Sequence, residues 1–103
     1  MAQTEKALRI LGFAHRARKL SLGTSATLAG IISRKVQSVV LASDLAENTR
    51  SKIEKAAKAQ GIPIYCFGTK AEFGHFFKCK DVGVIGVLDK SFAQGVGQSQ
   101  NAQ

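Results

Sequence analysis

Two short runs of apolar residues do most to constrain what this chain can fold into. "SVVLAS" at 38–43 and "VGVIGVL" at 82–88 contain no charged residue. A strand that is apolar on both faces has to be covered on both faces, as the central strands of an α/β domain are. A third run, "IPIYCFG" at 62–68, contains the single proline of the chain, Pro63. Since proline cannot donate a ladder hydrogen bond, we expect a strand that starts there or lies at a sheet edge.

Helix-like segments alternate with these runs. A helix is predicted over 4–18, with Thr4 as its N-cap. Its buried stripe, at helical spacing, consists of Ala7, Ile10, Leu11 and Ala14. "KLSLG" then predicts a short strand ending at Gly23, followed by a second helix over 24–34. The residues that this second helix is expected to bury are Leu28, Ile31 and Ile32.

Three further helix starts carry capping signals. "DLAE" at 44–47 matches a capping box, with Asp44 as the cap of a helix that runs to Gln60 and Glu47 bonding back. "TKAE" at 69–72 predicts a second box, and Asp89 is expected to cap a last helical turn. Strands that alternate with helices predict an α/β class domain over 1–96. Residues 97–103 are expected to form a flexible polar tail.

The positive charge of the chain is unevenly spread. The formal net charge is +8; residues 1–35 hold seven Lys or Arg and one acid, whereas 36–103 hold eight and six. This asymmetry predicts a basic face, for which nucleic acid is the commonest partner and an anionic membrane surface the second.

The expected cellular compartment of the protein is inferred from features that the sequence lacks. No apolar run reaches the roughly 18 residues that a membrane span needs, and no signal peptide is recognisable. We therefore expect a cytoplasmic protein without a membrane partner. Cys66 and Cys79 are expected to be reduced thiols in or near the core.

No pattern typical of an active site is visible. His15 and His75 stand apart from any Cys/His spacing that could hold a metal, and phosphate-binding and nucleophile motifs are missing. Asp44 and Glu47 suggest a carboxylate pair, but a capping box accounts for them. The glycines of "GVIG" are interpreted as allowing close packing. The sequence therefore predicts no enzyme activity, no cofactor and no metal.

The basic residues near the second helix predict a phosphate-binding surface. Arg18 and Lys19 come shortly before Gly23, and helix starts present free N–H groups that suit phosphate oxygens. More positive charge on either side comes from Arg16, Arg34 and Lys35. A stripe of small residues on this helix consists of Ala26, Gly30 and Ser33. It would let an RNA backbone approach closely, and close packing of another helix of the same protein is the alternative.

Three segments resemble a known family: "ILGFAHRARKLSLG", "SVVLASDLAENTRSKIEKAAKAQGIPIYCFGTKAEFG" and "VGVIGVLDKSFAQG". They are similar to the kink-turn-binding ribosomal proteins (large-subunit proteins seven-Ae and thirty-e), especially the short bacterial branch, over roughly residues 7–96. The resemblance implies a three-layer α/β/α sandwich around a small mixed sheet. It also implies binding to RNA kink-turns, in ribosomal or other structured RNA, with the ribosome as a partner.

The resemblance also implies where RNA would be contacted. The second helix would enter the groove beside tandem G·A pairs through Gly23, Thr24, Ser25, Ala26 and Ala29. A loop would cover the flipped nucleotide of the bulge, with contacts from Lys78, Lys80 and Val82.

This chain departs from the family pattern at three of those positions. Strong binders have Asn-Glu where this chain has Ser25-Ala26, and a Lys where it has Ala29. Those side chains contact the G·A base edges and support guanine recognition. One good base contact gives about 1–3 kcal/mol of discrimination, so we expect weak base discrimination with phosphate affinity retained.

Two other functions compete with RNA binding. The small-residue stripe and the cluster of Phe73, Phe76 and Phe77 would suit a protein–protein or dimerisation surface. The same fold is also attached to RNA-modifying enzymes as a recognition domain, but no second domain is visible here. Salt dependence separates the first alternative from RNA binding, since only phosphate contacts give a steep response to salt.

Overall fold

The computed structural model describes residues 2–101. Within this range the elements follow one another in the order α1 (Ala2–Arg16), β1 (Leu20–Leu22), α2 (Thr24–Ile32), β2 (Ser38–Leu41), α3 (Glu47–Ala59), β3 (Ile64–Cys66), α4 (Lys70–Phe76), β4 (Val84–Val87) and α5 (Lys90–Asn101). The predicted alternation of strands and helices is therefore confirmed. Besides the three strands expected from the apolar runs, the sheet contains β1, which is the short strand expected before Gly23.

The four strands form one mixed sheet in the order β1-β4-β2-β3. β4 runs antiparallel to both β1 and β2, whereas β3 runs parallel to β2 and lies at the edge, as expected of a strand that starts after Pro63. Val87 pairs with Leu20 on one side and with Ser38 on the other. The starts of β1 and β2 and the end of β4 therefore lie together at one end of the sheet.

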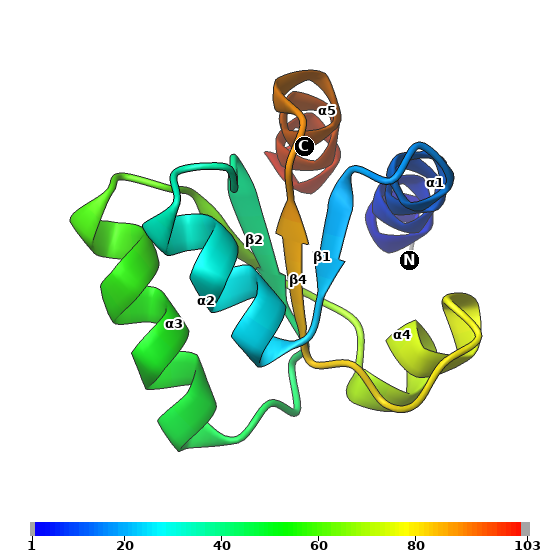
Figure 1. Cartoon of the computed structure of the whole chain (residues 1–103). Helices are drawn as coiled ribbons and strands as arrows, with labels where there is room; N and C mark the ends of the chain where they lie inside the picture. Colours follow the sequence, from blue (N-terminus) through cyan, green and yellow to red (C-terminus); the bar gives the residue numbers. More distant parts are fainter. Residues whose placement is uncertain (1, 102–103) are drawn as a thin grey trace.

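Helices cover both faces of this sheet, which confirms a three-layer α/β/α sandwich. Figure 1 shows α2 and α3 on one face and α1, α4 and α5 on the other. The buried side chains alternate accordingly along β2: Val40 packs in the cluster with α1, α4 and α5, whereas Val39 and Leu41 pack with α2 and α3. This alternation explains why β2 is apolar at consecutive positions.

A glycine of β4 allows α2 to lie close to the sheet. A Cβ added at Gly86 would stand 3.1 Å from Cγ2 of both Thr27 and Val36. Thr27 is fully buried there, and its Oγ1 donates a hydrogen bond of 3.4 Å to the carbonyl of Ser21. Close packing, the interpretation given to "GVIG", is thus confirmed for Gly86.

The packing of α2 corrects two predictions. Ile32, expected to be buried, is 68 % exposed, and Thr27 takes the core position instead. The stripe of small residues does not form one open face, because a Cβ at Gly30 would lie 2.7 Å from Val36 Cγ2. Ala26 and Ser33 remain exposed. Gly30 is therefore closely packed, but against the α2–β2 connection and not against another helix, which was the alternative.

The two predicted capping boxes turned out differently. The box at 69–72 is confirmed: Thr69 Oγ1 accepts from the N–H of Glu72, whose carboxylate accepts from the N–H of Thr69. The box at 44–47 is wrong, because α3 starts at Glu47 with Ala46 as its N-cap and no side-chain cap. Asp44 instead accepts from the N–H of Lys70, at 2.9 Å, across 26 residues of chain.

A tertiary contact explains why Asp44 is diverted. Ser43 donates two hydrogen bonds to the carbonyl of Gly68, from its N–H at 2.8 Å and from its hydroxyl at 2.7 Å. These bonds hold the turn after β2 beside the start of α4. The carboxylate of Asp44 therefore lies next to a free N–H at the start of α4 and accepts a hydrogen bond from it, instead of capping α3.

The ends of the chain differ from the predictions as well. α1 begins at Ala2, so Thr4 lies in its first turn rather than before it. Asp89 caps the last helix as expected, accepting from the N–H of Phe92 at 3.0 Å. That helix is longer than one turn: it continues to Asn101 where a flexible tail was predicted from 97 onward, and Gly97 and Ser99 are buried. Residues 102–103 lie outside the described range.

Candidate nucleic-acid interface

The start of α2 is an uncapped helix terminus. Gly23 is its N-cap, with a φ of 102°, a conformation that favours glycine, and no side chain caps the first turn. The N–H of Gly23 donates to the carbonyl of Val84 at 2.8 Å, which fixes the helix start against β4. The N–H groups of the first turn, with the positive end of the helix dipole, are left for a ligand.

The outward face of this helix is uncharged. Ser25, Ala26 and Ala29 are exposed, whereas Thr24 is half-buried. Neither alanine can hydrogen-bond a base edge through its side chain, and Ser25 offers one hydroxyl. The face can therefore fit a ligand by shape and contact it by backbone and hydroxyl groups.

The loop between α4 and β4 ends next to this helix start, because it leads into Val84, whose carbonyl accepts from the N–H of Gly23. The N–H of Cys79 donates to Gly74 at 2.8 Å and the N–H of Val82 donates to Lys70 at 3.2 Å, so the loop folds back on α4. Lys78 and Lys80 are exposed on it. Because this loop leads into the start of β4, which Gly23 contacts, Lys78 and Lys80 lie at the same end of the sheet as Gly23. The Val82 side chain is only 8 % exposed and packs in the core, so it has little surface to offer a ligand.

We call this region the α2-start end; it comprises Gly23, the first turn of α2 and the segments 42–46, 67–70 and 77–83. Its charges are mixed. Lys70, Lys78 and Lys80 share it with the acidic residues Asp44 and Asp81, and Glu47 and Glu72 follow its segments in the starts of α3 and α4.

Arg18 and Lys19 lie at the opposite end of the sheet, so the expectation that they adjoin the start of α2 is wrong. The carbonyl of Lys19 accepts from the N–H of Leu88 at 2.8 Å, just after the end of β4. β1 separates these residues from Gly23, and its three residues span about 10 Å at roughly 3.3 Å each. Neighbours in sequence are thus distant in space.

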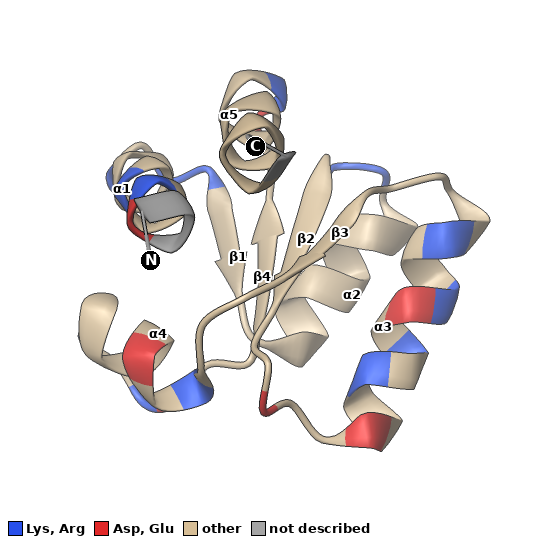
Figure 2. Ribbon diagram, turned by 180° about the vertical axis from the view of Figure 1, so that it is seen from behind, with Lys and Arg blue, Asp and Glu red and all other residues tan. Residues whose placement is uncertain are grey.

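Five basic residues gather at this opposite end, which we call the basic end. They are Arg18, Lys19, Arg34, Lys35 and Lys90. Figure 2 shows their positions as blue segments in the α1–β1 and α2–β2 connections and at the start of α5. All five are exposed. Sequence reasoning missed Lys90, although its place directly after the cap Asp89 and the last strand could have indicated it.

Left-handed backbone is found at three basic residues. Within residues 2–101, the non-glycine residues with positive φ are Arg18, Arg34 and Lys78, at 60°, 64° and 57°. Each follows the end of a helix, where glycine is common because it adopts this conformation without strain. A cation there interacts favourably with the carboxyl end of the helix.

Arg16 is the last residue of α1. It is exposed on α1, and its guanidinium carbon lies 4.9 Å from the centre of the Phe13 ring. The phenylalanines of α4 are mainly core: Phe73 is fully buried and Phe77 nearly so, while Phe76 is 40 % exposed. The expected aromatic interaction surface is therefore reduced to Phe76.

Both cysteines are free and exposed, so the prediction of core thiols is wrong in its placement. Cys66 Sγ accepts a hydrogen bond of 3.5 Å from Arg50 Nη2. This hydrogen bond and the electrostatic interaction with Cys66 raise the pKa of Arg50. Arg50 also lies 4.0 Å from Glu54, in the single ion pair found among the described residues.

The described residues contain no group of three or more His, Cys, Asp or Glu placed to hold a metal ion. His15 packs against Phe77, with ring centres 4.9 Å apart. Among the described helices, none has the length and apolar character to cross a membrane.

A three-layer α/β/α domain with an open helix start beside a lysine-bearing loop defines a class of small ribosomal-protein-like domains. The chain belongs to the ribosomal protein L7Ae/L30e/S12e/Gadd45 family, whose sequence model matches residues 5–96.

Individual relatives agree with this family. The chain is 32 % identical over 90 residues to the RNA-binding protein YlxQ of Enterococcus faecium, covering 87 % of this chain and 86 % of the relative. A Bacillus halodurans protein of unknown function has a similar structure, with a TM-score of 0.87 and 29 % identity over 91 % of this chain and 95 % of the other. The 15.5kD RNA-binding protein of Giardia lamblia shares the fold, with a TM-score of 0.80 and 17 % identity over 97 % and 89 % of the two chains.

Proposed function

We propose that this protein is a non-enzymatic RNA-binding protein that binds structured RNA at its α2-start end. The observation that carries the proposal is the uncapped, acid-free first turn of α2 beside the exposed Lys78 and Lys80, in a chain of this family. Two of its relatives, from Enterococcus faecium and Giardia lamblia, are RNA-binding proteins by name. We further propose that the protein is located in the cytoplasm and that ribosomal RNA is among the structured RNAs it binds.

The proposed contact uses backbone and shape more than base-reading side chains. Phosphate oxygens accept from the free N–H groups at the start of α2, with Gly23 permitting close approach. Thr24 and Ser25 add hydroxyl groups, and Ala26 and Ala29 leave room for a groove edge. Lys78 and Lys80 then neutralise phosphates on the loop side.

A kink-turn is the proposed RNA form, because its sharp bend and widened groove can be recognised through shape. Ala26 and Ala29 replace the base-reading side chains of strong binders, so the preference for G·A pairs is expected to be modest. Arg18, Lys19, Arg34 and Lys35 lie too far from the start of α2 to join this contact.

The test is binding of the purified protein to a kink-turn RNA and to the same RNA with its G·A pairs replaced, across a salt series. Tighter binding to the intact kink-turn supports the proposal, and a Lys78→Ala/Lys80→Ala variant should weaken it. Lys52→Ala/Lys55→Ala, two exposed lysines of α3, is the matched control. Equal binding of both RNAs by all three proteins would contradict recognition at the α2-start end.

A further inference from the structure

Three connections meet at the basic end and hold its cations together. The N–H of Leu88 donates to the carbonyl of Lys19 at 2.8 Å, and the N–H of Gln37 donates to the carbonyl of Val87 at 2.7 Å. The β4–α5 connection is therefore bonded on one side to the segment that carries Arg18 and Lys19, and on the other to the segment that carries Arg34 and Lys35. Cations from separate parts of the sequence thus form one patch.

The charge of this patch is nearly unopposed. The acidic residue next to it is Asp89, whose carboxylate already accepts from the N–H of Phe92. Among the described side chains, no acidic group lies within 4.0 Å of the five cations, since the ion pair found joins Arg50 and Glu54. The α2-start end, by contrast, balances three lysines with acids. A polyanion is therefore attracted more strongly to the basic end.

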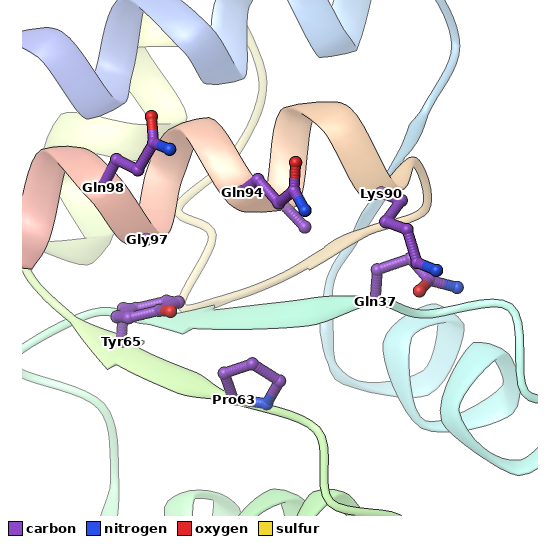
Figure 3. Close-up of a pocket in the computed structure, with 8 residues that line it drawn as sticks. Gln37, Pro63, Tyr65, Lys90, Gln94, Gly97 and Gln98 are labelled. Carbon is purple, nitrogen blue, oxygen red and sulfur yellow. The ribbon is translucent and has the colours of Figure 1, made fainter.

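A groove extends the basic end along α5 and the edge strand β3. Figure 3 shows Lys90 and Gln37 at one end of this groove, with Pro63 and Tyr65 on its β3 side and Gln94 and Gln98 on α5. Its volume, ≈ 450 Å³, lies within the range of about 300–1,000 Å³ for small-ligand pockets. Amide groups next to cations suit the ribose hydroxyls of an RNA strand whose phosphates lie on the patch.

The two ends are separate in space. The sheet lies between them, and β1 alone, with three residues at roughly 3.3 Å each, spans about 10 Å, slightly more than the Debye length of about 8 Å at physiological salt. A single phosphate contact cannot satisfy both ends. One RNA segment at the α2-start end leaves the basic end free.

We propose that the basic end, formed by Arg18, Lys19, Arg34, Lys35 and Lys90, binds a second segment of RNA, so that the protein bridges two RNA segments at opposite ends of its sheet. The proposal rests on the proposed function, since the first segment is the one bound by the start of α2. The second contact reads phosphate and ribose rather than sequence.

The experiment immobilises a kink-turn RNA, adds the protein, and measures capture of a labelled plain RNA duplex. The test variant is Lys19→Ala/Lys35→Ala/Lys90→Ala, which avoids the left-handed positions. The control variant, Lys52→Ala/Lys55→Ala/Lys58→Ala, removes the same charge from exposed positions of α3. The test variant should bind the immobilised RNA within about twofold of the unchanged protein and lose at least tenfold in capture, a loss that fits three phosphate contacts. The control variant should retain both.

Direct binding of the plain duplex adds a second measurement. Removing three phosphate contacts should flatten the log–log salt dependence by about 2–3, at roughly 0.9 per contact. Capture that is unchanged in the test variant, or reduced equally in the control variant, overturns the bridging proposal while leaving kink-turn binding intact. Duplex binding that depends on the basic end, with no preference for the kink-turn, overturns the α2-start contact instead. Failure to bind either RNA overturns both.

Discussion

The two ends of the sheet expose different chemical groups. The α2-start end offers backbone N–H groups, small side chains and a balanced set of charges, whereas the basic end offers five side-chain cations on three connections. Backbone groups are fixed in place and recognise a shape; long cations adapt and recognise charge. The comparison teaches that net charge need not coincide with specificity, since the greater charge lies at the end for which we propose the weaker discrimination between RNAs.

The largest expected effect comes from loosening α2, which spans both ends. Gly86→Val places side-chain atoms where a Cβ alone would already lie 3.1 Å from Thr27 and Val36. Overpacking of this kind costs about 1–3 kcal/mol, and we expect the upper part of that range in urea unfolding. Binding at both ends should weaken together. Ala59→Val, at an exposed position of α3, is the control and should change stability by less than about 1 kcal/mol.

A change at Gly74 should separate the ends. A Cβ there would stand 2.9 Å from the carbonyl oxygen of Lys80 and 3.0 Å from Asp81 Cα, so Gly74→Ala must displace the loop that carries Lys78. We expect kink-turn affinity to fall about tenfold, equivalent to about 1.4 kcal/mol, with plain-duplex binding unchanged. Ala71→Ser, exposed on the same helix, should alter neither titration. An equal loss of duplex binding would show that the two ends are not independent.

Adding a cation to the α2-start end should sharpen its specificity. Ala29→Lys restores the residue type found in strong binders at an exposed position of α2. One added base contact is worth about 1–3 kcal/mol, so the affinity ratio between intact and G·A-replaced kink-turn should rise about fivefold or more. Ala59→Lys adds the same charge to an exposed position of α3 and should leave this ratio unchanged. The same ratio in both variants would mean that α2 does not face the G·A pairs.

The smallest expected effect concerns backbone strain at the basic end. Arg34→Gly removes a side chain from a residue with φ of 64°, which should raise the unfolding free energy by about 0.5–1 kcal/mol. Plain-duplex binding at low salt should nevertheless weaken. Lys35→Gly removes the same charge at a neighbouring residue without positive φ, so thermal unfolding of that variant should show no gain in stability. A gain in both variants would attribute the effect to charge repulsion instead of strain.

Local patterns predicted much of the fold because local physics decides it. Continuous apolar runs identified β2 and β4, and the box at Thr69 and Glu72 was confirmed because its partners lie three residues apart. The box at Asp44 has the same spacing and failed, since a hydrogen bond to Lys70 competes from 26 residues away. Sequence spacing does not reveal such competition.

The candidate site was predicted less completely for a related reason. Gly23 and the loop of Lys78 and Lys80 were assigned to one end through the family resemblance, which carries three-dimensional information. Arg18 and Lys19 were joined to Gly23 by proximity in sequence, and the intervening strand separates them. The length of α5 was missed because its glutamines, serine and glycines indicate a tail, although Phe92, Val96 and Ser99 recur at helical spacing on its partly or fully buried side.

The packing of α1 against α5 has a consequence for how the chain is made. These helices are the first and last elements of the described chain, yet they contact each other directly, with Ile10 close to Gly95. A ribosome synthesises α1 long before α5, so the apolar side of α1 lacks this partner until all four strands have been translated. The layer that contains them can therefore be completed only after every strand of the sheet has been made, and α1 remains accessible to chaperones until then.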